Sequence, residues 1–318
     1  MASEFDIIRD FFTRPSKHTD LSIGDDAALI QPSPGTQLAI STDMLVAGTH
    51  FFVDAAPYDI GWKSLAVNIS DMAAMGAQPK WATLSISLAE NDTQWLSEFA
   101  RGFFACADKF NVDLIGGDTT RGPLNISVTI IGETPIGRGL VRSGAKEGDD
   151  IWVSGHIGSA AAGLAHLQGK MALENVALHA SLDALHRPMP RVALGLALRN
   201  IANSAIDISD GLAQDLGHIL AASHLGAEVF YESIPKNPAL KAKLDAVFET
   251  MVLSGGDDYE LCFTAPQQAR DAIRNIGQEL NLQLSRIGII RAGNGLTVYD
   301  AENKAMSLQK TGYDHFKK

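Results

Sequence analysis

The chain has 318 residues, of which 46% are hydrophobic and 20% charged, and its formal net charge is -11 at pH 7. This length exceeds what one ordinary hydrophobic core holds and favours two domains. The acidic balance argues against a nucleic-acid partner, because binding a phosphate backbone needs a basic surface. An anionic ligand would therefore have to be held through metal ions or local arginines.

Nothing in the sequence suggests secretion or membrane insertion. The first residues are acidic and lack a basic region followed by an apolar stretch, which a signal peptide has. No apolar run approaches the roughly 20 residues needed to cross a bilayer. Cys106 and Cys262 stand in apolar contexts and predict buried free thiols rather than a disulfide. We therefore expect a cytoplasmic protein with no membrane partner.

The first part of the chain predicts an α/β unit with two substantial helices. Helical spacing over 4–13 ends at Pro15, and longer helices are expected over 58–76 and 91–110. Apolar runs and period-two alternation predict the strands, which are 27–30, 37–41, 81–88, 112–115 and 125–131.

A stretch rich in glycine and charge over 137–150 predicts the domain boundary, which gives domains 1–137 and 138–318. The second domain continues the mixture of helices and strands, so the expected fold class is α/β (α+β) with mixed sheets. Its expected helices are 158–168, 192–202, 211–225 and 266–280, and its expected strands are 151–154, 205–208, 228–231, 251–253, 259–264 and 283–290.

Six short acidic clusters follow apolar runs or stand beside glycines, at 24–26, 41–43, 70–71, 116–118, 207–211 and 255–258. Aspartates just after strands would repel one another if they converged, unless divalent cations drew them together. Hard cations held by carboxylates are common equipment for handling phosphate. The clusters therefore predict magnesium-dependent phosphoryl chemistry.

Two clusters in the first domain allow competing interpretations. Ser64, Asn68 and Asp71 share one face of the helix expected over 58–76. Such a stripe is commonly a solvated face, but with a single charge it is at least equally compatible with a face turned towards a site.

Gly116 and Gly117 allow positive φ and close approach of backbone N–H groups to a phosphate, and the aspartate after them would hold a bridging metal. Taken alone, Gly-Gly-Asp is more often an ordinary turn.

In the second domain, Asp207 and Asp210 flank Ser209 at an expected strand-to-helix turn. Asp210 would serve as the N-cap of the helix, whereas Asp207 in an apolar run is better explained as a metal ligand.

Arg142 is either a phosphate contact through its planar guanidinium or a surface arginine near a linker. His50, next to aromatic residues, is more often a packed side chain than a ligand, but it could also touch a substrate.

The order of the clusters carries more information than any one of them. No P-loop, protein-kinase set or Gly-x-Ser-x-Gly elbow is present, so any phosphoryl transfer uses another scaffold. The ordered motifs are Ile-Gly-Asp-Asp at 23–26, Ser-Thr-Asp at 41–43, Ser-Asp-Met at 70–72, Gly-Gly-Asp-Thr-Thr at 116–120, Asp-Ile-Ser-Asp-Gly at 207–211 and Gly-Gly-Asp-Asp-Tyr-Glu at 255–260. In this order, and continued to 312–316, they resemble the thiamine-monophosphate kinase family.

The resemblance implies transfer of the γ-phosphoryl group of ATP to thiamine monophosphate, which gives thiamine diphosphate and ADP. It also implies the two-domain fold of aminoimidazole ribonucleotide synthetase, in which N-terminal domains that bind ATP and magnesium pair in a homodimer. The hypothesis for the chemistry is direct in-line transfer with several Mg²⁺ ions and no catalytic side chain.

The resemblance also implies residue roles. The positions that match metal ligands are Asp26, Ser41, Thr42, Asp43, Asp71, Asp118, Asp207 and Asp210. The positions that match nucleotide contacts are Gly117, Asp118, Arg142 and Ser209, and those that match substrate contacts are His50, Asp257 and Tyr313. Asp257 stands where other members often have glutamate, and Tyr313 where some have tryptophan.

Other functions stay open on grounds of fold. A selenophosphate synthetase would need a cysteine near the N-terminus, and the first 100 residues have none. A hydrogenase-maturation dehydratase would need a cysteine at the C-terminus, where this sequence has none. A purine-synthesis ligase of the same fold and a non-catalytic nucleotide- or metal-binding protein remain as alternatives.

Overall fold

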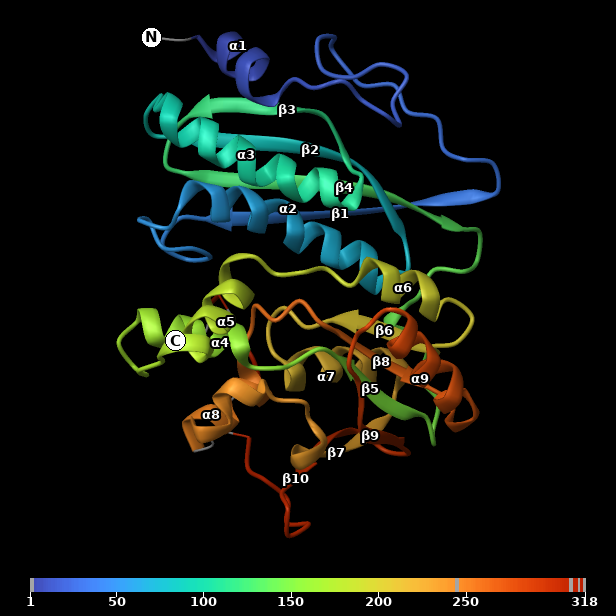
Figure 1. Cartoon of the computed structure of the whole chain (residues 1–318). Helices are drawn as coiled ribbons and strands as arrows, with labels where there is room; N and C mark the ends of the chain where they lie inside the picture. Colours follow the sequence, from blue (N-terminus) through green and yellow to red (C-terminus); the bar gives the residue numbers. More distant parts are fainter. Residues whose placement is uncertain (1–2, 244–245, 309–310, 314, 317–318) are drawn as a thin grey trace. The chain divides into compact units, whose positions relative to one another are not determined.

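The computed structural model describes residues 3–243, 246–308, 311–313 and 315–316 (Figure 1). The chain divides into two compact units, each of which is described by itself. The N-terminal unit comprises Met1–Met72 and Ala77–Gly137, and the C-terminal unit comprises Ala73–Gly76 and Arg138–Lys318. The fold class is mixed α/β with two mixed sheets, as the sequence predicts.

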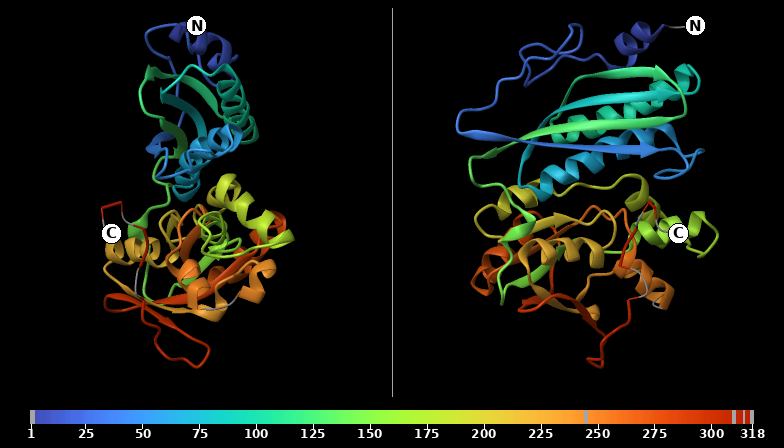
Figure 2. Two further views of the ribbon diagram at one scale, coloured as in Figure 1. Left: turned by 90° about the vertical axis from the view of Figure 1, so that its left-hand side faces the viewer. Right: turned by 180° about the vertical axis from the view of Figure 1, so that it is seen from behind.

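The N-terminal unit is built on a four-stranded sheet with the order β1-β4-β2-β3. The pairs β1/β4 and β2/β4 are antiparallel, and β2/β3 is parallel. The helices α2 and α3 cover the same face of this sheet (Figure 2). The elements are α1 (Glu4–Ile7), the π-helix η1 (Ile8–Phe12), β1 (Thr36–Val46), α2 (Pro57–Ala74), β2 (Gln78–Leu88), α3 (Thr93–Phe110), β3 (Asp113–Arg121) and β4 (Asn125–Pro135).

Local sequence signals explain how α3 begins and ends. The Asp92 carboxylate accepts hydrogen bonds from the N–H groups of Gln94 and Trp95, and so caps the first turn. Phe99 and Phe103 recur at helical spacing and are buried. The helix stops at Asn111, which adopts the left-handed conformation with φ 55°. The crossover from β2 to the parallel strand β3 is therefore defined by its own residues.

Two strands are longer than the sequence predicts. β1 continues through 41–43 to Val46, and β3 continues through 116–118 to Arg121. Both acidic clusters therefore lie within strands and not after them, because pairing with β4 and β2 continues along these polar residues. The strand expected over 27–30 is wrong: among the described residues this segment forms only an isolated bridge between Leu21 and Leu29.

The C-terminal unit contains a six-stranded sheet with the order β10-β7-β9-β5-β8-β6. Only β10/β7 is parallel among the pairs in this sheet. Its strands are β5 (Asp150–Ser154), β6 (Ser204–Asp207), β7 (Gly226–Phe230), β8 (Leu261–Ala265), β9 (Leu284–Arg291) and β10 (Gly295–Tyr299). Its helices are α4 (Ser159–Leu167), α5 (Asn175–His186), α6 (Val192–Leu198), α7 (Leu212–Ser223), α8 (Ala246–Ser254) and α9 (Arg270–Glu279), with 3-10 turns η2 (Arg142–Gly144), η3 (Tyr231–Ser233), η4 (Pro238–Lys243) and η5 (Gln267–Ala269).

The core of the C-terminal unit joins the sheet to α7 and α8. Leu212, Leu216 and Ile219 of α7 pack in one cluster with Ile151 of β5 and Val252 of α8. The strand expected over 251–253 is wrong, because this run is part of α8. A short apolar run does not reveal by itself whether it is a buried strand or a buried helix.

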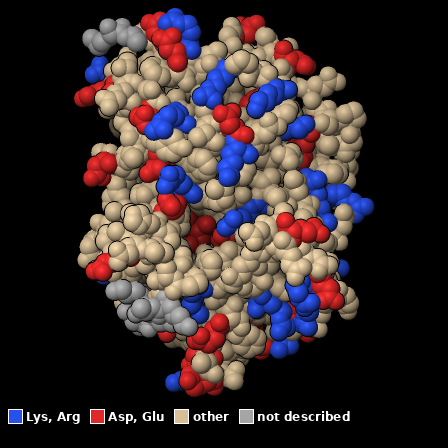
Figure 3. Space-filling model, in the orientation of Figure 1, with Lys and Arg blue, Asp and Glu red and all other residues tan. Residues whose placement is uncertain are grey.

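Charged side chains are interspersed on the surface, as Figure 3 shows for one face. Some form exposed ion pairs, such as Arg274 with Asp271 at 2.8 Å, and such pairs contribute little to stability. The pair of Asp150 with Arg270 is different, because Asp150 is fully buried and accepts hydrogen bonds from Nε and Nη2 of the partly exposed Arg270 at 2.5 and 2.8 Å. Among the described residues, no helix is both long and apolar enough to span a membrane.

Candidate functional site

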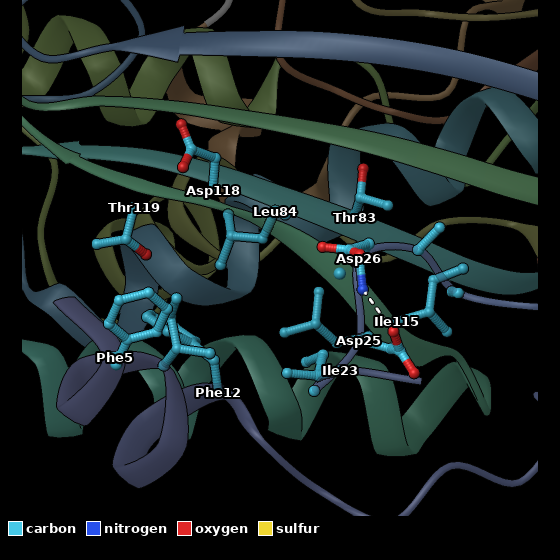
Figure 4. Close-up of a pocket in the computed structure, with 17 residues that line it drawn as sticks. Phe5, Phe12, Ile23, Asp25, Asp26, Thr83, Leu84, Ile115, Asp118 and Thr119 are labelled. Atoms are coloured by element: carbon cyan, nitrogen blue, oxygen red, sulfur yellow. Dashed lines mark hydrogen bonds between the residues drawn. The ribbon is translucent and has the colours of Figure 1, made fainter. Parts of the chain in front are cut away.

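A cavity of about 640 Å³ lies in the N-terminal unit (Figure 4). The loop 23–28 contributes Asp26 to its wall, and β3 contributes Gly117 and Asp118. Apolar side chains, including Phe12 and Leu84, line other parts of it. Three residues predicted to bind metal or nucleotide, from two distant parts of the sequence, therefore meet at one hollow with both polar and apolar walls.

Close packing against the neighbouring strand requires a glycine at position 117. Its φ is 146°, and a Cβ at this position would lie 1.8 Å from the carbonyl oxygen of Leu84 on the neighbouring strand. Only glycine fits this close approach of the two strands. The backbone of β3 is thus left without a side chain at the cavity wall, next to Asp118, which lets a phosphate approach the main chain closely.

A second cluster joins β1 to α2. The hydroxyl of Ser41 donates to Oδ2 of Asp71 at 2.5 Å, and the N–H of Asp43 donates to Oδ1 of Asn68 at 3.0 Å. Ser64 and Asn68 have no exposed surface. The polar stripe of α2 therefore faces β1 inside the unit, and the solvated-face interpretation is wrong.

Thr42 differs from its two neighbours. Side chains alternate along a strand, so Thr42 faces away from the side of the sheet that Ser41 faces. Its hydroxyl lies 2.8 Å from the hydroxyl of Thr129 on β4. The three residues predicted as one ligand group thus present their side chains to two different faces of the sheet.

The donors fit an oxygen-preferring cation. Asp26 and Asp118 share the cavity, and the carboxylate of Asp71 lies beside the hydroxyl of Ser41. Within the described part of the chain, no three His, Cys, Asp or Glu side chains gather as a ready-made metal site. Mg²⁺ commonly uses only one or two carboxylates and takes its other ligands from substrate phosphates and water. Asp26 and Asp118 therefore supply enough protein carboxylates for such binding.

In the C-terminal unit, the turn between β6 and α7 differs from the prediction. Oδ2 of Asp215 accepts hydrogen bonds from the N–H groups of Ser209, Asp210 and Gly211 at 3.0, 3.0 and 3.1 Å. Gly211 occupies the N-cap position, so the prediction that Asp210 caps α7 is wrong. Asp215, in the first turn of α7, instead holds the backbone of the turn that precedes the helix, and burial raises its pKa to about 7.

The carboxylate of Asp210 is therefore available for another role. It accepts a hydrogen bond from Nε2 of Gln214 at 3.3 Å. Partial burial raises the pKa of Asp210, and the neighbouring His315 opposes this increase. Asp207, at the end of β6, is 5% exposed. The turn thus contains two acidic residues that helix capping does not explain.

Main-chain hydrogen bonds bring two further segments to this turn. The N–H of Asp257 donates to the carbonyl of Ser209 at 2.8 Å, and the N–H of Tyr313 donates to the carbonyl of Asp210 at 3.0 Å. Gln214 also donates to the carbonyl of Tyr313 at 3.0 Å. Four predicted site residues, separated by up to 104 positions in the sequence (313 minus 209), therefore lie together.

Glu260 supports this region, and the sequence analysis missed its role. Its side chain is 7% exposed and pairs with Arg191, whose Nε lies 2.7 Å from Oε2. Ser154 donates to the same oxygen at 2.5 Å, and the carbonyl of Glu260 accepts from the N–H of Ile208 at 2.8 Å. The local signal was its place at the end of the Gly-Gly-Asp-Asp-Tyr-Glu motif, directly before the apolar run that begins at Leu261. Gln214 and Asp215 were also missed.

The remaining predicted residues lie outside these clusters. Nδ1 of His50 accepts a hydrogen bond from the N–H of Val46 at 3.0 Å, in the turn that follows β1. Arg142 is exposed in η2, and its carbonyl accepts from the hydroxyl of Ser223 at 3.1 Å. Cys106 and Cys262 are buried free thiols, as predicted, and burial raises the pKa of both.

Comparison with known proteins first defines the class. The family model for the N-terminal domain of AIR synthase related proteins matches residues 24–134, and the model for their C-terminal domain matches residues 146–301. The protein therefore has both domains of the AIR synthase related class. A hydrogenase maturation protein, HypE of Escherichia coli, has a similar structure with a TM-score of 0.79, but at 19% identity this likeness concerns the fold alone.

More similar relatives define the family. The thiamine-monophosphate kinases of Salmonella typhimurium and Escherichia coli are 45% and 44% identical to this chain, with 98% of both sequences covered in each case. The crystal structure of thiamine-monophosphate kinase from Stenotrophomonas maltophilia is 48% identical over 91% of this chain and 92% of that one, with a TM-score of 0.84. The chain belongs to the thiamine-monophosphate kinase family, and it is a phosphotransferase.

One solved relative contains ligands. It is described as AaThiL complexed with AMPPCP and TMP, is 30% identical to this chain, and covers 98% of this chain and 97% of its own, with a TM-score of 0.79.

Proposed function

We propose that the protein transfers the γ-phosphoryl group of ATP to thiamine monophosphate and releases thiamine diphosphate and ADP. Membership of the kinase family supports this reaction, as does the relative that was solved with an ATP analogue and TMP. The observation that carries the proposal is the cavity where Asp26, Gly117 and Asp118 meet. An acidic protein needs cations to hold such anionic substrates, and Asp26 and Asp118, beside the exposed backbone of Gly117, supply ligands for them.

The proposed roles of the side chains are positioning and charge cancellation. Mg²⁺ would neutralise phosphate charge and orient the phosphates for in-line transfer. We propose no general base, because a phosphate monoester is already largely ionised near neutral pH. The proposed metal ligands are Asp26, Ser41, Thr42, Asp43, Asp71, Asp118, Asp207 and Asp210; the proposed nucleotide contacts are Gly117, Asp118, Arg142 and Ser209; and the proposed substrate contacts are His50, Asp257 and Tyr313.

Within this set, the C-terminal turn has a distinct part. Asp215 binds the backbone of 209–211, which leaves the carboxylate of Asp210 to act as a ligand. Asp257 has φ 69°, a strained conformation for a residue other than glycine, and a hydrogen bond to Ser209 helps to maintain it. The geometry suits a carboxylate that must be placed accurately for a substrate.

We also propose that the protein is a cytoplasmic homodimer that pairs through domain 1–137. The face of β1 opposite α2 exposes Leu38, Ile40 and Met44. Apolar side chains grouped on one uncovered sheet face are typical of an interaction surface. Sedimentation at micromolar concentration should give the mass of a dimer, and a monomer alone would contradict this part of the proposal.

A coupled assay of ADP release tests the reaction. Thiamine monophosphate should support turnover that depends on Mg²⁺, whereas thiamine and an aminoimidazole ribonucleotide precursor should not. Turnover only with the ribonucleotide would favour the purine-synthesis ligase. Binding of ATP without ADP release on addition of any acceptor would favour a non-catalytic nucleotide-binding protein.

A further inference from the structure

The segment that joins η1 to β1, residues 13–35, carries one wall of the cavity. It contributes Gly24, Asp25 and Asp26 to the lining (Figure 4). It forms no helix or strand of its own, and its internal pairings are the isolated bridges between Leu21 and Leu29 and between Ile23 and Asp25. We call it the entry segment. The position of Asp26 therefore depends on how the entry segment is attached to the sheet.

The first attachment is the carboxylate of Asp113. Its Oδ2 accepts hydrogen bonds from the N–H groups of Lys17 and His18 at 2.7 and 2.6 Å. The indole N–H of Trp81 on β2 donates to the carbonyl of His18 at 2.8 Å. Asp113 is 7% exposed, so these bonds are shielded from competing water. One buried carboxylate thus holds two consecutive backbone N–H groups of the entry segment.

The second attachment, at the other end, uses different chemistry. Oε1 of Glu133 accepts from the N–H of Ser33 at 2.7 Å, and its Oε2 lies 2.7 Å from Nζ of Lys80. Lys80 also donates to the hydroxyl of Ser33 at 3.1 Å. The entry segment is therefore fixed at both ends by buried acidic side chains, with the residues that line the cavity between them.

Asp113 has the more direct link to the site. It is the first residue of β3, the same strand that supplies Gly117 and Asp118 to the cavity. It does not itself line the cavity. A paired strand is a stiff element, so fastening the entry segment to β3 fixes Asp26 in relation to Asp118.

We propose that Asp113 is a positioning residue, which holds the entry segment on β3 so that Asp26 and Asp118 face the same Mg²⁺-bound nucleotide. The inference rests on the proposed function, because it takes the cavity to be the nucleotide site. Asp113 acts only through the entry segment and makes no contact with the ligand.

The test compares Asp113→Ala and Asp113→Asn with the parent protein. Binding of the non-hydrolysable analogue AMPPCP with Mg²⁺, measured by calorimetry, should weaken about tenfold in Asp113→Ala, the size expected on loss of hydrogen bonds to a charged acceptor. Hydrogen exchange in a peptide covering 14–22 should become faster without any ligand. Asp113→Asn keeps an acceptor oxygen and should recover part of both properties.

Asp150→Asn is the matched control, because it alters a buried carboxylate in the C-terminal unit that binds Arg270 and Arg286. It should lower the unfolding midpoint and leave AMPPCP binding unchanged. A loss of nucleotide affinity as large in this control as in Asp113→Ala would make the effect a general loss of stability and overturn the inference.

Two further results would also overturn it. One is faster exchange in the entry segment with unchanged AMPPCP affinity. The other, which applies even if Asp113→Ala does not fold, is parent-like affinity and parent-like exchange in folded Asp113→Asn. A parent protein that binds AMPPCP but does not phosphorylate thiamine monophosphate would refute the proposed function while leaving the positioning role open to the same measurements.

Discussion

Asp118→Asn separates the chemistry of the candidate site from its stability. Asp118 is exposed at the cavity wall, and the substitution preserves its shape while removing its charge. The backbone here is fixed by pairing with β2, opposite Ser85. Surface substitutions of this kind usually change the free energy of unfolding by less than about 0.5 kcal/mol. We therefore expect an intact fold.

The effect on turnover should be much larger. Two unit charges about 4 Å apart interact by roughly 4 kcal/mol at the effective dielectric near a protein surface, and more with a divalent ion. If the transition state loses roughly this much stabilisation, the rate falls by about a thousandfold. The amide oxygen of asparagine remains a weak ligand, so more Mg²⁺ should recover only a small part of the rate.

The assay is ADP release with thiamine monophosphate over a series of Mg²⁺ concentrations, alongside urea unfolding. Asp108→Asn is the control, because Asp108 forms an exposed pair with Arg14 at 3.3 Å on α3, outside the cavity lining. It should change neither turnover nor stability appreciably. Near-normal turnover of Asp118→Asn at saturating Mg²⁺ would refute the assignment of Asp118 as a metal ligand.

Three further substitutions have defined outcomes. Glu260→Ala leaves the partly buried Arg191 without its partner and should lower the free energy of unfolding by about 1.5–3 kcal/mol, measured in urea, whereas adding Arg191→Leu should restore part of it. Gly117→Ala forces a Cβ against the carbonyl of Leu84 and should cost about 3 kcal/mol of stability and weaken nucleotide binding; parent-like stability would contradict the steric argument. Burial raises the pKa of Asp258, so the stability it contributes is present below its unfolded pKa and declines as pH rises through the higher folded pKa. Asp258→Asn should therefore gain stability relative to the parent as the pH rises above the ordinary pKa of an aspartate, and a difference that stays constant with pH would count against this.

The sequence was most informative where a local pattern was long. The helix expected over 58–76 is α2, and the one expected over 91–110 is α3, since both have many turns of consistent spacing. Other elements were less predictable. The 12-residue helix α5 and the five-residue strand β10 were not identified, and the short run 251–253 was assigned to the wrong class. In such short runs, contacts with distant residues decide the conformation, and local preference does not.

The candidate site shows the same division. The ordered motifs named the residues, and the structure places Asp26 with Asp118 and Asp257 with Ser209. The motifs did not reveal that Asp215 holds the backbone of the turn before α7, because the choice between two acidic side chains depends on the geometry of the turn. Nor did they reveal the anchoring role of Asp113, whose partners lie 96 and 95 positions away.

The sequence by itself determined the chemical inventory: carboxylates spaced beside glycines, two buried thiols and enough apolar residues for two units. These properties follow from residue type and short-range spacing, which survive without a fold. The tertiary structure decided which side of the sheet each polar residue faces, as with Ser41 and Thr42, and which buried acids support the site without lining it. Those outcomes depend on strand register and on hydrogen bonds between distant segments, which exist only once the chain has packed.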